Sequence, residues 1–380
     1  MKRILIATGI FPPDIGGPAT YGHILAGALI SRDFDVRVIT YSGSKKTGPD
    51  PKLKISKVSK SLPKGIKHLW FFLKAIFLVR KSDTVLALNA VSAGFPASLA
   101  ARLFKKRFVV RIAGDYAWEM AALKGKTTLL IDDFQTLPKR GFLHSIQVFV
   151  AGRADNVIVP SEYLKSLVAG WGINPEKIKV IYNGVDFKPA DLSKEEARTK
   201  LGIHGNIILS VGRLVPWKGF RMLIKAMPKL IELNQFFRLV IVGDGPERKN
   251  LEAMAKNIGL DKKINIAGKK SSQELALYMA AADVFILNSS YEGFSHQILE
   301  AMKAGVPVIV SAIRGNREIV RQGENGFLVK YNDEFNLAEA VKTLHQNPDI
   351  KEDFIQGGKK TVEKFSVEKM IEETVKFLTQ

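Results

Sequence analysis

The hydrophobic and polar positions repeat one unit along almost the whole chain: a short apolar run, a glycine-containing loop, then a stretch with helical periodicity. Continuous apolar strands that alternate with helices predict parallel sheets covered on both faces. Ten strands are expected, at Ile4–Thr8, Val36–Thr40, Val85–Leu88, Phe108–Ile112, Asn156–Val159, Ile207–Val211, Arg238–Val242, Lys263–Ala267, Val284–Leu287 and Val306–Val310. The pattern predicts an α/β protein with two doubly wound domains.

The boundary between the two domains is expected near the middle of the chain. Asn183-Gly184 is a turn signal, and a polar stretch over 188–200 precedes the strand that restarts the pattern. We expect one domain over 1–187, a second over 188–360, and a helix over 361–380 that returns to the first domain. Ligands of such sheets bind beyond the carboxyl ends of the strands, so two facing domains would hold a ligand in the cleft between them.

Composition agrees with a globular protein and adds one unusual property, a strong positive charge. The 380 residues are 46% hydrophobic and 25% charged, and the absence of cysteine excludes a disulfide framework or a cysteine-based zinc site. The chain has 57 basic and 37 acidic residues, a net charge of +20. Residues 1–190 hold 29 basic and 13 acidic residues, or +16, which leaves +4 for the remainder. An anionic partner or surface is therefore expected at the first domain.

Two apolar stretches could be mistaken for export or membrane segments. The run Ile4–Phe11 is short, lacks a small-residue cleavage site and ends at two prolines, so a first strand is expected instead. The uncharged stretch Thr84–Ala101 contains Asn89, Gly94 and Pro96 and is better explained as strand, loop and helix. We expect a soluble or peripheral protein.

The first candidate site is the loop between the first strand and the first helix. Gly16-Gly17 would let a ligand approach the backbone closely, and the amides of the following helix N-terminus suit an anion. The loop has neither the spacing of a dinucleotide fingerprint nor the Gly-Lys-Ser/Thr of a P-loop. An ordinary tight turn explains the glycines equally well.

The second candidate site follows the strand at Ile207–Val211. Arg213 and Lys218 lie five residues apart in one loop, and a guanidinium with a mobile ammonium suits a diphosphate leaving group. The alternative is a pair of solvated surface cations. A related loop, Gly243-Asp244-Gly245-Pro246, follows another strand and either starts a helix or shapes a nucleoside pocket.

The third candidate site is the segment from Asn288 to Met302, where a strand leads through a loop into a helix. Glu292 lies in the loop and Glu300 about a turn and a half into the helix, so both carboxylates can face the same side. Carboxylates accept hydrogen bonds from sugar hydroxyls, and the amides at the helix N-terminus can hold phosphate. Favourable placement of acids near a helix start explains one of them, at about 0.3–1 kcal/mol, but less easily both.

The order of these motifs resembles the retaining glycosyltransferases of family 4, which have the GT-B fold with two Rossmann-like domains. The resemblance rests on the Gly-Gly loop, V-G-R-L-x-x-x-K-G, V-G-D-G-P, and E-x7-E followed by A-M-x-A-G-x-P-V-I, and it covers nearly the whole chain. Each motif is weak alone and specific in this order. The segment Ile178–Asp186 is similar to the family's connection into the second domain.

The resemblance implies transfer of a sugar from a UDP- or GDP-sugar to a lipid-linked or saccharide acceptor with retention, in the synthesis of a cell-envelope polysaccharide or glycolipid. The second domain would bind the donor and the first the acceptor. The implied catalytic residues are Glu292 on the donor sugar, Arg213 and Lys218 on the diphosphate, and Asp115. The implied donor-binding residues are Gly16, Gly17, Gly243, Asp244, Gly245, Gly268, Lys269, Gly293, Phe294, Ser295 and Glu300, with Glu300 on the ribose. No bound cofactor and no metal is expected, because the two cations would neutralise the diphosphate.

The sequence departs from the family pattern at three places. Many relatives carry a histidine after the strand at Phe108–Ile112, where this chain has Asp115, which either takes over its hydrogen-bonding role or reflects a different acceptor side. His296 and Asn316 also stand where other residues are commoner. Asp33-Phe34-Asp35 has the D-x-D spacing of metal-dependent glycosyltransferases, but it precedes a strand and is expected to be a turn.

The basic first domain leaves a choice of partners. The segment His68–Lys81 predicts a very apolar helix, either packed in the core or partly inserted into a membrane interface, and for this helix we favour the core. For the domain surface we favour an anionic membrane, and so a cytoplasmic protein at the inner face of the plasma membrane. No nucleic-acid-binding motif is visible, although nucleic acid is the competing class for so basic a chain. A sugar-nucleotide epimerase of the same shape is the alternative enzyme.

Overall fold

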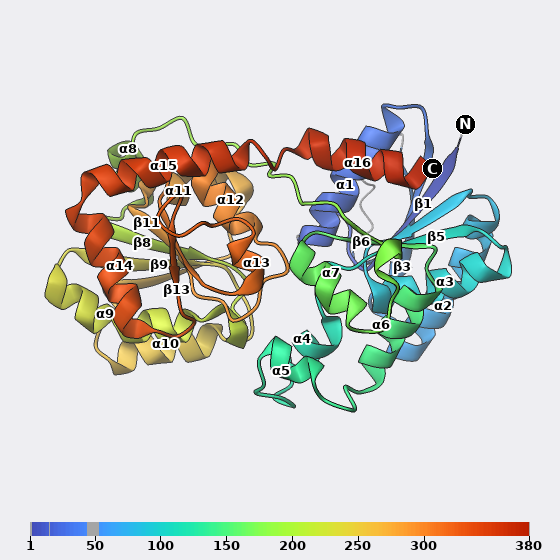
Figure 1. The fold of residues 1–380 in the computed structure, drawn as a ribbon, viewed down its shortest axis with the longest axis horizontal. Helices are drawn as coiled ribbons and strands as arrows, with labels where there is room; N and C mark the ends of the chain where they lie inside the picture. The colour runs from blue at the N-terminus through green and yellow to red at the C-terminus, as the bar shows by residue number, and fades with distance from the viewer. Residues whose placement is uncertain (1, 15, 44–52, 380) are drawn as a thin grey trace. The chain divides into compact units, whose positions relative to one another are not determined.

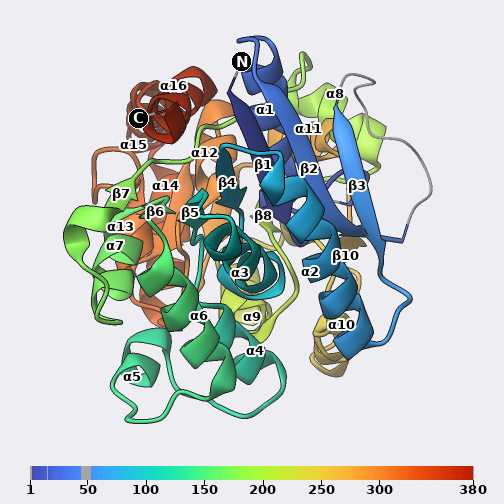
Figure 2. The ribbon, with the colours of Figure 1, turned by 90° about the vertical axis from the view of Figure 1, so that its right-hand side faces the viewer.

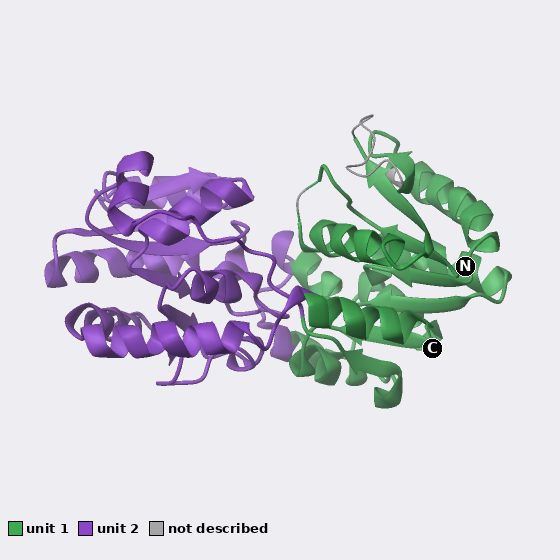
Figure 3. Cartoon of the chain, turned by 90° about the horizontal axis from the view of Figure 1, so that it is seen from above, with its two compact units in different colours: residues 1–121, 134–182, 368–380 green, residues 122–133, 183–367 purple. Residues whose placement is uncertain are grey.

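The structure is a computed structural model that describes residues 2–14, 16–43 and 53–379. Ile15 of the Gly-Gly loop, and Lys45, Lys46 and Lys52 of the basic stretch, lie outside the described residues. The chain divides into two compact units (Figure 3). Unit 1 comprises residues 1–121, 134–182 and 368–380, and unit 2 comprises residues 122–133 and 183–367.

Unit 1 contains a parallel sheet of seven strands, here called sheet A, in the order β3-β2-β1-β4-β5-β6-β7 (Figure 1). Its strands are β1 (Arg3–Thr8), β2 (Asp35–Ser42), β3 (Lys54–Ser59), β4 (Thr84–Ala87), β5 (Arg107–Arg111), β6 (Asn156–Val159) and β7 (Ile178–Val180). The central strands are buried on both faces, which explains their uninterrupted apolar sequences. The order reverses direction between β1 and β4.

Helices on both faces bury sheet A. Between β1 and the end of β7 the chain forms α1 (Gly17–Ile30), α2 (Lys64–Arg80), α3 (Phe95–Leu103), α4 (Tyr116–Leu123), α5 (Ile131–Gln135), α6 (Phe142–Arg153) and α7 (Glu162–Ala169), with short turns η1 (Ala90–Gly94) and η2 (Pro175–Lys177). Of these, α4 and α5 extend into residues 122–133, which are assigned to unit 2. Helix α3 packs against α2 and α6, and Figure 2 shows these three together on the side that faces the viewer.

Unit 2 repeats the architecture with a parallel sheet of six strands, sheet B, in the order β10-β9-β8-β11-β12-β13. Its strands are β8 (Asn206–Val211), β9 (Phe237–Val242), β10 (Ile264–Gly268), β11 (Val284–Leu287), β12 (Val308–Ser311) and β13 (Phe327–Val329). Its other elements are α8 (Lys194–Leu201), η3 (Pro216–Lys218), α9 (Phe220–Leu233), α10 (Arg248–Asn257), α11 (Ser272–Ala281), α12 (His296–Lys303), α13 (Arg314–Arg317), α14 (Glu334–Gln346) and α15 (Pro348–Val362). The order reverses between β8 and β11.

All ten expected strands are present, with ends that differ by one or two residues. The described residues contain three more strands, β3, β7 and β13, and each of them is an edge strand. Edge strands are short and tolerate charged side chains, so they lack the continuous apolar signature of the central strands. The lysines of β3 and the three-residue length of β7 and β13 explain why the pattern did not reveal them.

The last helix, α16 (Val367–Thr379), lies almost entirely in the segment 368–380, which is part of unit 1. Thr374 is fully buried, and its hydroxyl lies 3.1 Å from the hydroxyl of Tyr21 on α1. Arg107 at the start of β5 donates hydrogen bonds to the carbonyls of Phe377 and Leu378, at 2.8 and 3.0 Å. These bonds satisfy carbonyls that the helix C-terminus leaves without partners.

Helix α2 is buried on one face and exposed on another. Phe71, Ala75 and Val79, spaced four residues apart, are completely buried against the sheet. The opposite stripe is exposed to solvent. Phe77, for example, keeps 71% of its surface accessible. The other exposed apolar residues of this stripe are Ile66, Leu69, Trp70 and Leu73. The expectation of a helix held in the core is therefore wrong for this stripe.

Candidate active site

The strand order of sheet B selects the position of the site. Ligands of doubly wound sheets bind beyond the carboxyl ends of the strands, where the strand order reverses. In sheet B this point lies between β8 and β11. The loop 212–219 follows β8 and the loop 288–295 follows β11, so the two most informative sequence motifs meet at the switch point.

An ion pair connects these two loops. Lys218 Nζ lies 2.6 Å from Glu292 Oε1, and both side chains are nearly buried, with 13% and 9% of their surface exposed. The hydroxyl of Ser289 donates to the same carboxylate oxygen at 2.6 Å. Because this charge-assisted pair is largely shielded from water, it fixes both side chains. The ammonium and the carboxylate are therefore held in a defined geometry.

Arg213 stands in contrast to this pair. It is exposed in the same loop as Lys218, and within the described part of the chain its guanidinium makes no ion pair or hydrogen bond. The site therefore holds two cations, of which one is already paired with a carboxylate and the other is available to an anionic ligand.

Glycines let the loops at the carboxyl end of sheet B approach one another. Gly219 has φ 68°, and a Cβ there would lie 1.8 Å from the carbonyl oxygen of Asn288. A Cβ on Gly243, with φ 152°, would lie 1.8 Å from the carbonyl oxygen of Gly212. Any side chain at either position would force the backbone apart. The glycines of both motifs are therefore required by packing, whatever they bind.

The loop 243–246 is tied to its neighbours by backbone hydrogen bonds. Leu214 N donates to Asp244 O at 3.1 Å, and Gly243 N donates to Gly268 O at 2.9 Å. The carboxylate of Asp244 accepts from the amide of Gly245 at 2.8 Å, as in many tight turns. Lys269, the residue after Gly268, is exposed. The structure thus brings together the loops after β8, β9 and β10.

The loop that carries Glu292 is held from its other side by α13. A Cβ on Gly315 would lie 2.1 Å from the carbonyl oxygen of Glu292, so glycine is needed there as well. Asn316, one of the departures from the family pattern, is completely buried, and its amide donates to the carbonyl of Ser311 at 2.9 Å and to the hydroxyl of Ser311 at 3.1 Å. This residue supports the loop from beneath.

Helix α12 begins directly after this loop. Gly293, Phe294 and Ser295 are buried, and the Phe294 ring meets Phe365 edge to face with centroids 5.2 Å apart. Ser295 precedes the first turn without capping it through its side chain. Glu300 lies farther along the helix, where burial raises the pKa of its carboxyl from 4.5 to about 7. A carboxyl in that range changes charge near neutral pH.

The candidate residues of unit 1 lie at the carboxyl end of sheet A. Gly16 precedes α1, and its carbonyl accepts from the amides of Ala19 and Thr20 at 2.9 and 3.0 Å. A Cβ on Gly17 would meet no atom of the described residues within 4 Å. Neither packing nor φ therefore requires glycine at position 17, in contrast to Gly219 and Gly243.

Asp115 is completely buried and has several hydrogen-bond partners. Its carboxylate accepts from the amide of Trp118 at 3.1 Å, from Gln135 Nε2 at 2.8 Å and from Gln147 Nε2 at 3.1 Å. Gln135 Oε1 in turn accepts from the indole of Trp171 at 3.0 Å. Asp115 thereby joins α4, α5 and α6.

The sequence motifs did not identify Ser289, Gln135 or Gln147. Lone serines and glutamines carry no spacing signal, and their roles depend on which strand ends and helices meet. Gly315 could have been identified from the sequence as a residue of the site, because it lies in the last loop of the family pattern.

The D-x-D spacing is not part of the site. Asp35 is the first residue of β2, so it lies at the amino ends of the strands of sheet A, opposite to the loops described above. Its carboxylate pairs with Arg37 at 3.2 Å and with Lys54 at 3.3 Å. In the part of the chain that the structure describes, no three His, Asp or Glu residues are grouped to hold a metal ion.

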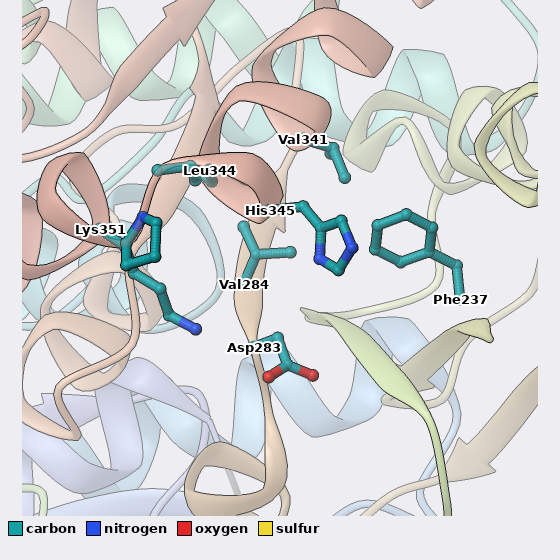
Figure 4. Close-up of a pocket in the computed structure, with 8 residues that line it drawn as sticks. Phe237, Asp283, Val284, Val341, Leu344, His345 and Lys351 are labelled. Carbon is teal, nitrogen blue, oxygen red and sulfur yellow. The ribbon is translucent and has the colours of Figure 1, made fainter. Parts of the chain in front are cut away.

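A pocket of about 150 Å³ lies at the amino end of sheet B (Figure 4). The ring of His345 lies beside Phe237, with centroids 5.1 Å apart. Asp283 in its wall is paired with Lys194 at 2.9 Å and with Arg198 at 2.5 Å. The pocket is at the opposite end of the strands from Glu292, so it is separate from the candidate active site.

Two family sequence models match the chain, one in each half. Residues 15–188 match "Glycosyltransferase Family 4", and residues 193–361 match "Glycosyl transferases group 1". An uncharacterized glycosyltransferase of Methanocaldococcus jannaschii is 30% identical, over 98% of this chain and 97% of that protein. A Campylobacter jejuni enzyme, N-acetylgalactosamine-N,N'-diacetylbacillosaminyl-diphospho-undecaprenol 4-alpha-N-acetylgalactosaminyltransferase, is 27% identical over 71% of this chain and 75% of its own.

Solved structures show the same fold. Anabaena HepE in complex with UDP and glucose has a TM-score of 0.81 at 20% identity, with 100% of each chain covered. Two Rossmann-like units with parallel sheets and these structural neighbours identify the fold as GT-B, which the resemblance implied. With both halves matched and a relative 30% identical along nearly its whole length, the chain belongs to the family 4 glycosyltransferases.

Proposed function

We propose that this glycosyltransferase moves a sugar from a nucleotide-diphosphate sugar to a hydroxyl of a lipid-linked or saccharide acceptor, with retention of configuration and without a metal ion. Unit 2 binds the donor and unit 1 the acceptor. The observation that carries the proposal is the Lys218–Glu292 pair at the switch point of sheet B. Lys218 lies in the same loop as Arg213, which forms no ion pair with the described residues.

Each charged group has a role in this proposal. Arg213 and Lys218 neutralise the diphosphate as negative charge develops on it, which stabilises the transition state. Glu292 accepts hydrogen bonds from the donor-sugar hydroxyls while it orients Lys218, and Glu300 accepts from the ribose hydroxyls. The two cations supply the positive charge that a divalent ion supplies in metal-dependent enzymes.

The proposed chemistry needs no protein nucleophile. The acceptor hydroxyl attacks the anomeric carbon from the face that the diphosphate leaves, so the bond from carbon to phosphate oxygen breaks as the bond to the acceptor oxygen forms. The acceptor proton passes to the departing phosphate. Gly16 and Gly17 hold the phosphates through backbone amides at the start of α1. Gly243, Asp244, Gly245, Gly268 and Lys269 border the nucleoside, and Gly293, Phe294 and Ser295 lie against the donor.

Asp115 enters the proposal as a positioning residue. Its complete burial and its bonds to Trp118, Gln135 and Gln147 support a role in holding the loop after β5, where many relatives have a histidine. Contact with the acceptor would then come from residues that this network orients.

The test of the proposal begins with thermal-shift measurements with UDP, GDP and ADP, followed by the matching nucleotide-sugars and mass spectrometry of the products. Solved complexes of Anabaena HepE contain UDP and UDP-glucose, which makes UDP the first nucleotide to try. Glu292→Gln and Lys218→Ala should each lower kcat by about 10²–10³, the range seen when one transition-state contact is lost. Lys256→Ala, an exposed lysine of unit 2, serves as the control.

Near wild-type turnover in either site variant would contradict the assignment. An isomerised nucleotide-sugar without transfer would favour the epimerase alternative instead.

The acceptor side is proposed to face an anionic membrane, at the inner face of the plasma membrane. Two observations support this: the excess of basic residues in the first half and the exposed apolar stripe of α2, with Lys67 and Lys74 on the same helix. An apolar stripe flanked by cations suits a membrane interface. None of the described helices has the length and apolarity of a membrane-spanning segment. The name of the C. jejuni relative contains a diphospho-undecaprenol-linked acceptor, which supports a lipid-linked acceptor.

Flotation with phosphatidylcholine vesicles, with and without phosphatidylglycerol, tests the membrane proposal. Leu69→Ser with Phe77→Ser should release the protein from anionic vesicles. Leu233→Ser with Phe236→Ser is the matched control, because it removes an exposed leucine and an exposed phenylalanine from unit 2. Equal retention of both double variants would contradict the proposal, and tighter binding to duplex or single-stranded DNA than to vesicles would favour nucleic acid.

A further inference from the structure

A second concentration of positive charge lies at the amino end of sheet A, away from the loops of the acceptor side. A pocket of about 710 Å³ opens there between the last turn of α3, the turn into β5 and the last turn of α6. Its cations are Arg102, Lys105, Lys106, Arg107 and Arg153, and its only acid among the described residues is Asp155. Figure 2 shows the neighbouring helices α3 and α6 on the side that faces the viewer.

The nearby acids are occupied and do not neutralise these cations. Asp155 Oδ2 accepts from the amide of Phe108 at 2.7 Å, which fixes it as a support for β5. Asp83, at the start of the adjacent strand β4, is paired with Arg3 at 2.8 Å. Among the described residues, Arg102, Lys105 and Lys106 form no ion pair. Asp83 also interacts electrostatically with Lys106, so part of the charge is offset and the pocket keeps an excess of positive charge.

Helix termini explain only part of this charge. Arg102 and Arg153 occupy the last turns of α3 and α6, where cations are favourable because of the helix dipole. That effect fades within a turn and gives no reason for Lys105, Lys106 and Arg107, which follow in the connection to β5. Three adjacent cations beside two helix-terminal ones repel one another, and an anion that enters the pocket relieves the repulsion.

The pocket also contains rigid parts. Arg107 is held by the carbonyls of Phe377 and Leu378 and by Asn156 Oδ1 at 3.0 Å. The Arg153 guanidinium lies over the Phe149 ring, 3.8 Å from its centroid. Fixed guanidinium groups beside mobile lysines are a combination that suits phosphate, because the planar groups orient its oxygens and the ammonium groups add charge.

We propose that this pocket, defined by Arg102, Lys105, Lys106, Arg107 and Arg153, is a second anion site that binds a ligand with clustered phosphate groups. It lies at the opposite end of the strands from the loops where ligands of doubly wound sheets bind, so its ligand is not the sugar acceptor in transfer. The phosphates come either from a soluble polyphosphate compound or from the headgroups of acidic lipids. The site does not depend on the function proposed above.

Isothermal titration with inorganic tripolyphosphate is the first test, carried out on the full chain at low salt. Lys105→Glu with Lys106→Glu should weaken binding at least tenfold. Lys256→Glu with Lys262→Glu, at exposed positions of unit 2, changes the net charge by the same amount and should leave the affinity within about twofold. Arg102→Gln with Lys105→Gln gives a milder variant, expected to bind more weakly than wild type, in case charge reversal impairs folding.

Lys218→Ala separates this site from the candidate active site. It should leave tripolyphosphate affinity unchanged, and the double variant at positions 105 and 106 should leave the UDP thermal shift unchanged. Failure of UDP to bind would contradict the proposed function and not this site. Loss of tripolyphosphate binding in Lys218→Ala would overturn the second site, because the probe would then occupy the loops of unit 2.

Vesicle flotation identifies the source of the phosphates. Phosphatidylcholine vesicles with phosphatidic acid should bind the variant at positions 105 and 106 more weakly than the wild type if the ligand is a lipid headgroup. They should bind both equally if the ligand is soluble and only tripolyphosphate binding is lost. Equal behaviour of the site variant and the charge-matched control in both measurements would overturn the proposal.

Discussion

Sheets A and B share the order of their first six strands, yet the loops at their carboxyl ends differ in how they are held together. In unit 2, glycines such as Gly219 and Gly243 allow the loops to touch, and Lys218 and Glu292 pair between them. In unit 1, Gly17 faces open space, and the loop after β5 is held by the buried network around Asp115. The common topology fixes where a ligand can bind, and the packing of the loops determines how far the binding site is preorganised before the ligand arrives.

The sharpest way to break this comparison is a pair of glycine substitutions. Gly243→Ala places a Cβ 1.8 Å from the carbonyl oxygen of Gly212, so it should lower the free energy of unfolding by about 2–4 kcal/mol and shift Tm down by several degrees. Gly17→Ala should leave stability within about 0.5 kcal/mol, because its Cβ meets nothing, and still reduce transfer if phosphates approach the backbone there. Equal Tm losses in the two variants would remove the contrast between the loops.

A second variant tests whether Asp115 positions or reacts. Asp115→Asn replaces an acceptor oxygen by a donor that faces Gln135 or Gln147, so it should cost about 1–3 kcal/mol of stability. The KM for the donor should stay unchanged, because the hydrogen-bond partners of Asp115 include none of the residues proposed to bind the donor. Asp191→Asn, at an exposed position, is the control for thermal unfolding. An unchanged Tm with a large fall in kcat would show instead that Asp115 takes part in the chemistry.

The smallest effect concerns the charge of Glu300 in the proposed donor site. Its pKa is raised to about 7, so the carboxylate that we propose as the acceptor of ribose hydrogen bonds is mostly absent at pH 6 and mostly present at pH 8. UDP affinity should therefore rise by up to about tenfold over this interval, which is about 1.4 kcal/mol. The Glu300→Gln variant should lack this increase in affinity. It should keep only the pH dependence that comes from ionisation of the UDP phosphate itself.

The same group makes the opposite contribution to stability. Because the folded-state pKa lies above the ordinary value of 4.5, the contribution is complete at low pH and is lost as the pH rises through about 7. Glu300→Gln should accordingly raise the free energy of unfolding at pH 8 by on the order of 1 kcal/mol, since the partial exposure of the side chain reduces the full effect. Parallel pH profiles for the wild type and the variant would show that the burial of Glu300 has no electrostatic consequence.

Much of the fold could be predicted from the sequence, because the central strands are buried on both faces and must be apolar throughout. The ten strands follow from that signature. The edge strands β3, β7 and β13 could not be predicted, since a strand with only one neighbour tolerates lysines and very short lengths. The expectation that α2 lies in the core is wrong for its exposed stripe for a related reason. An apolar composition does not reveal whether another element covers the second face of a helix.

The sequence by itself determined the chemical inventory of this glycosyltransferase: two cations after β8, two carboxylates around the start of α12, and the excess of positive charge in the first half. Only the tertiary structure decided which of these groups meet. It paired Lys218 with Glu292 and left Arg213 free of ion pairs within the described residues, it buried Asp115, and it collected Arg102, Lys105, Lys106, Arg107 and Arg153 around one pocket. The physical reason is that spacing along the chain sets residue type and local element, whereas distance and dielectric environment arise only when separate strand ends and helix ends are packed together.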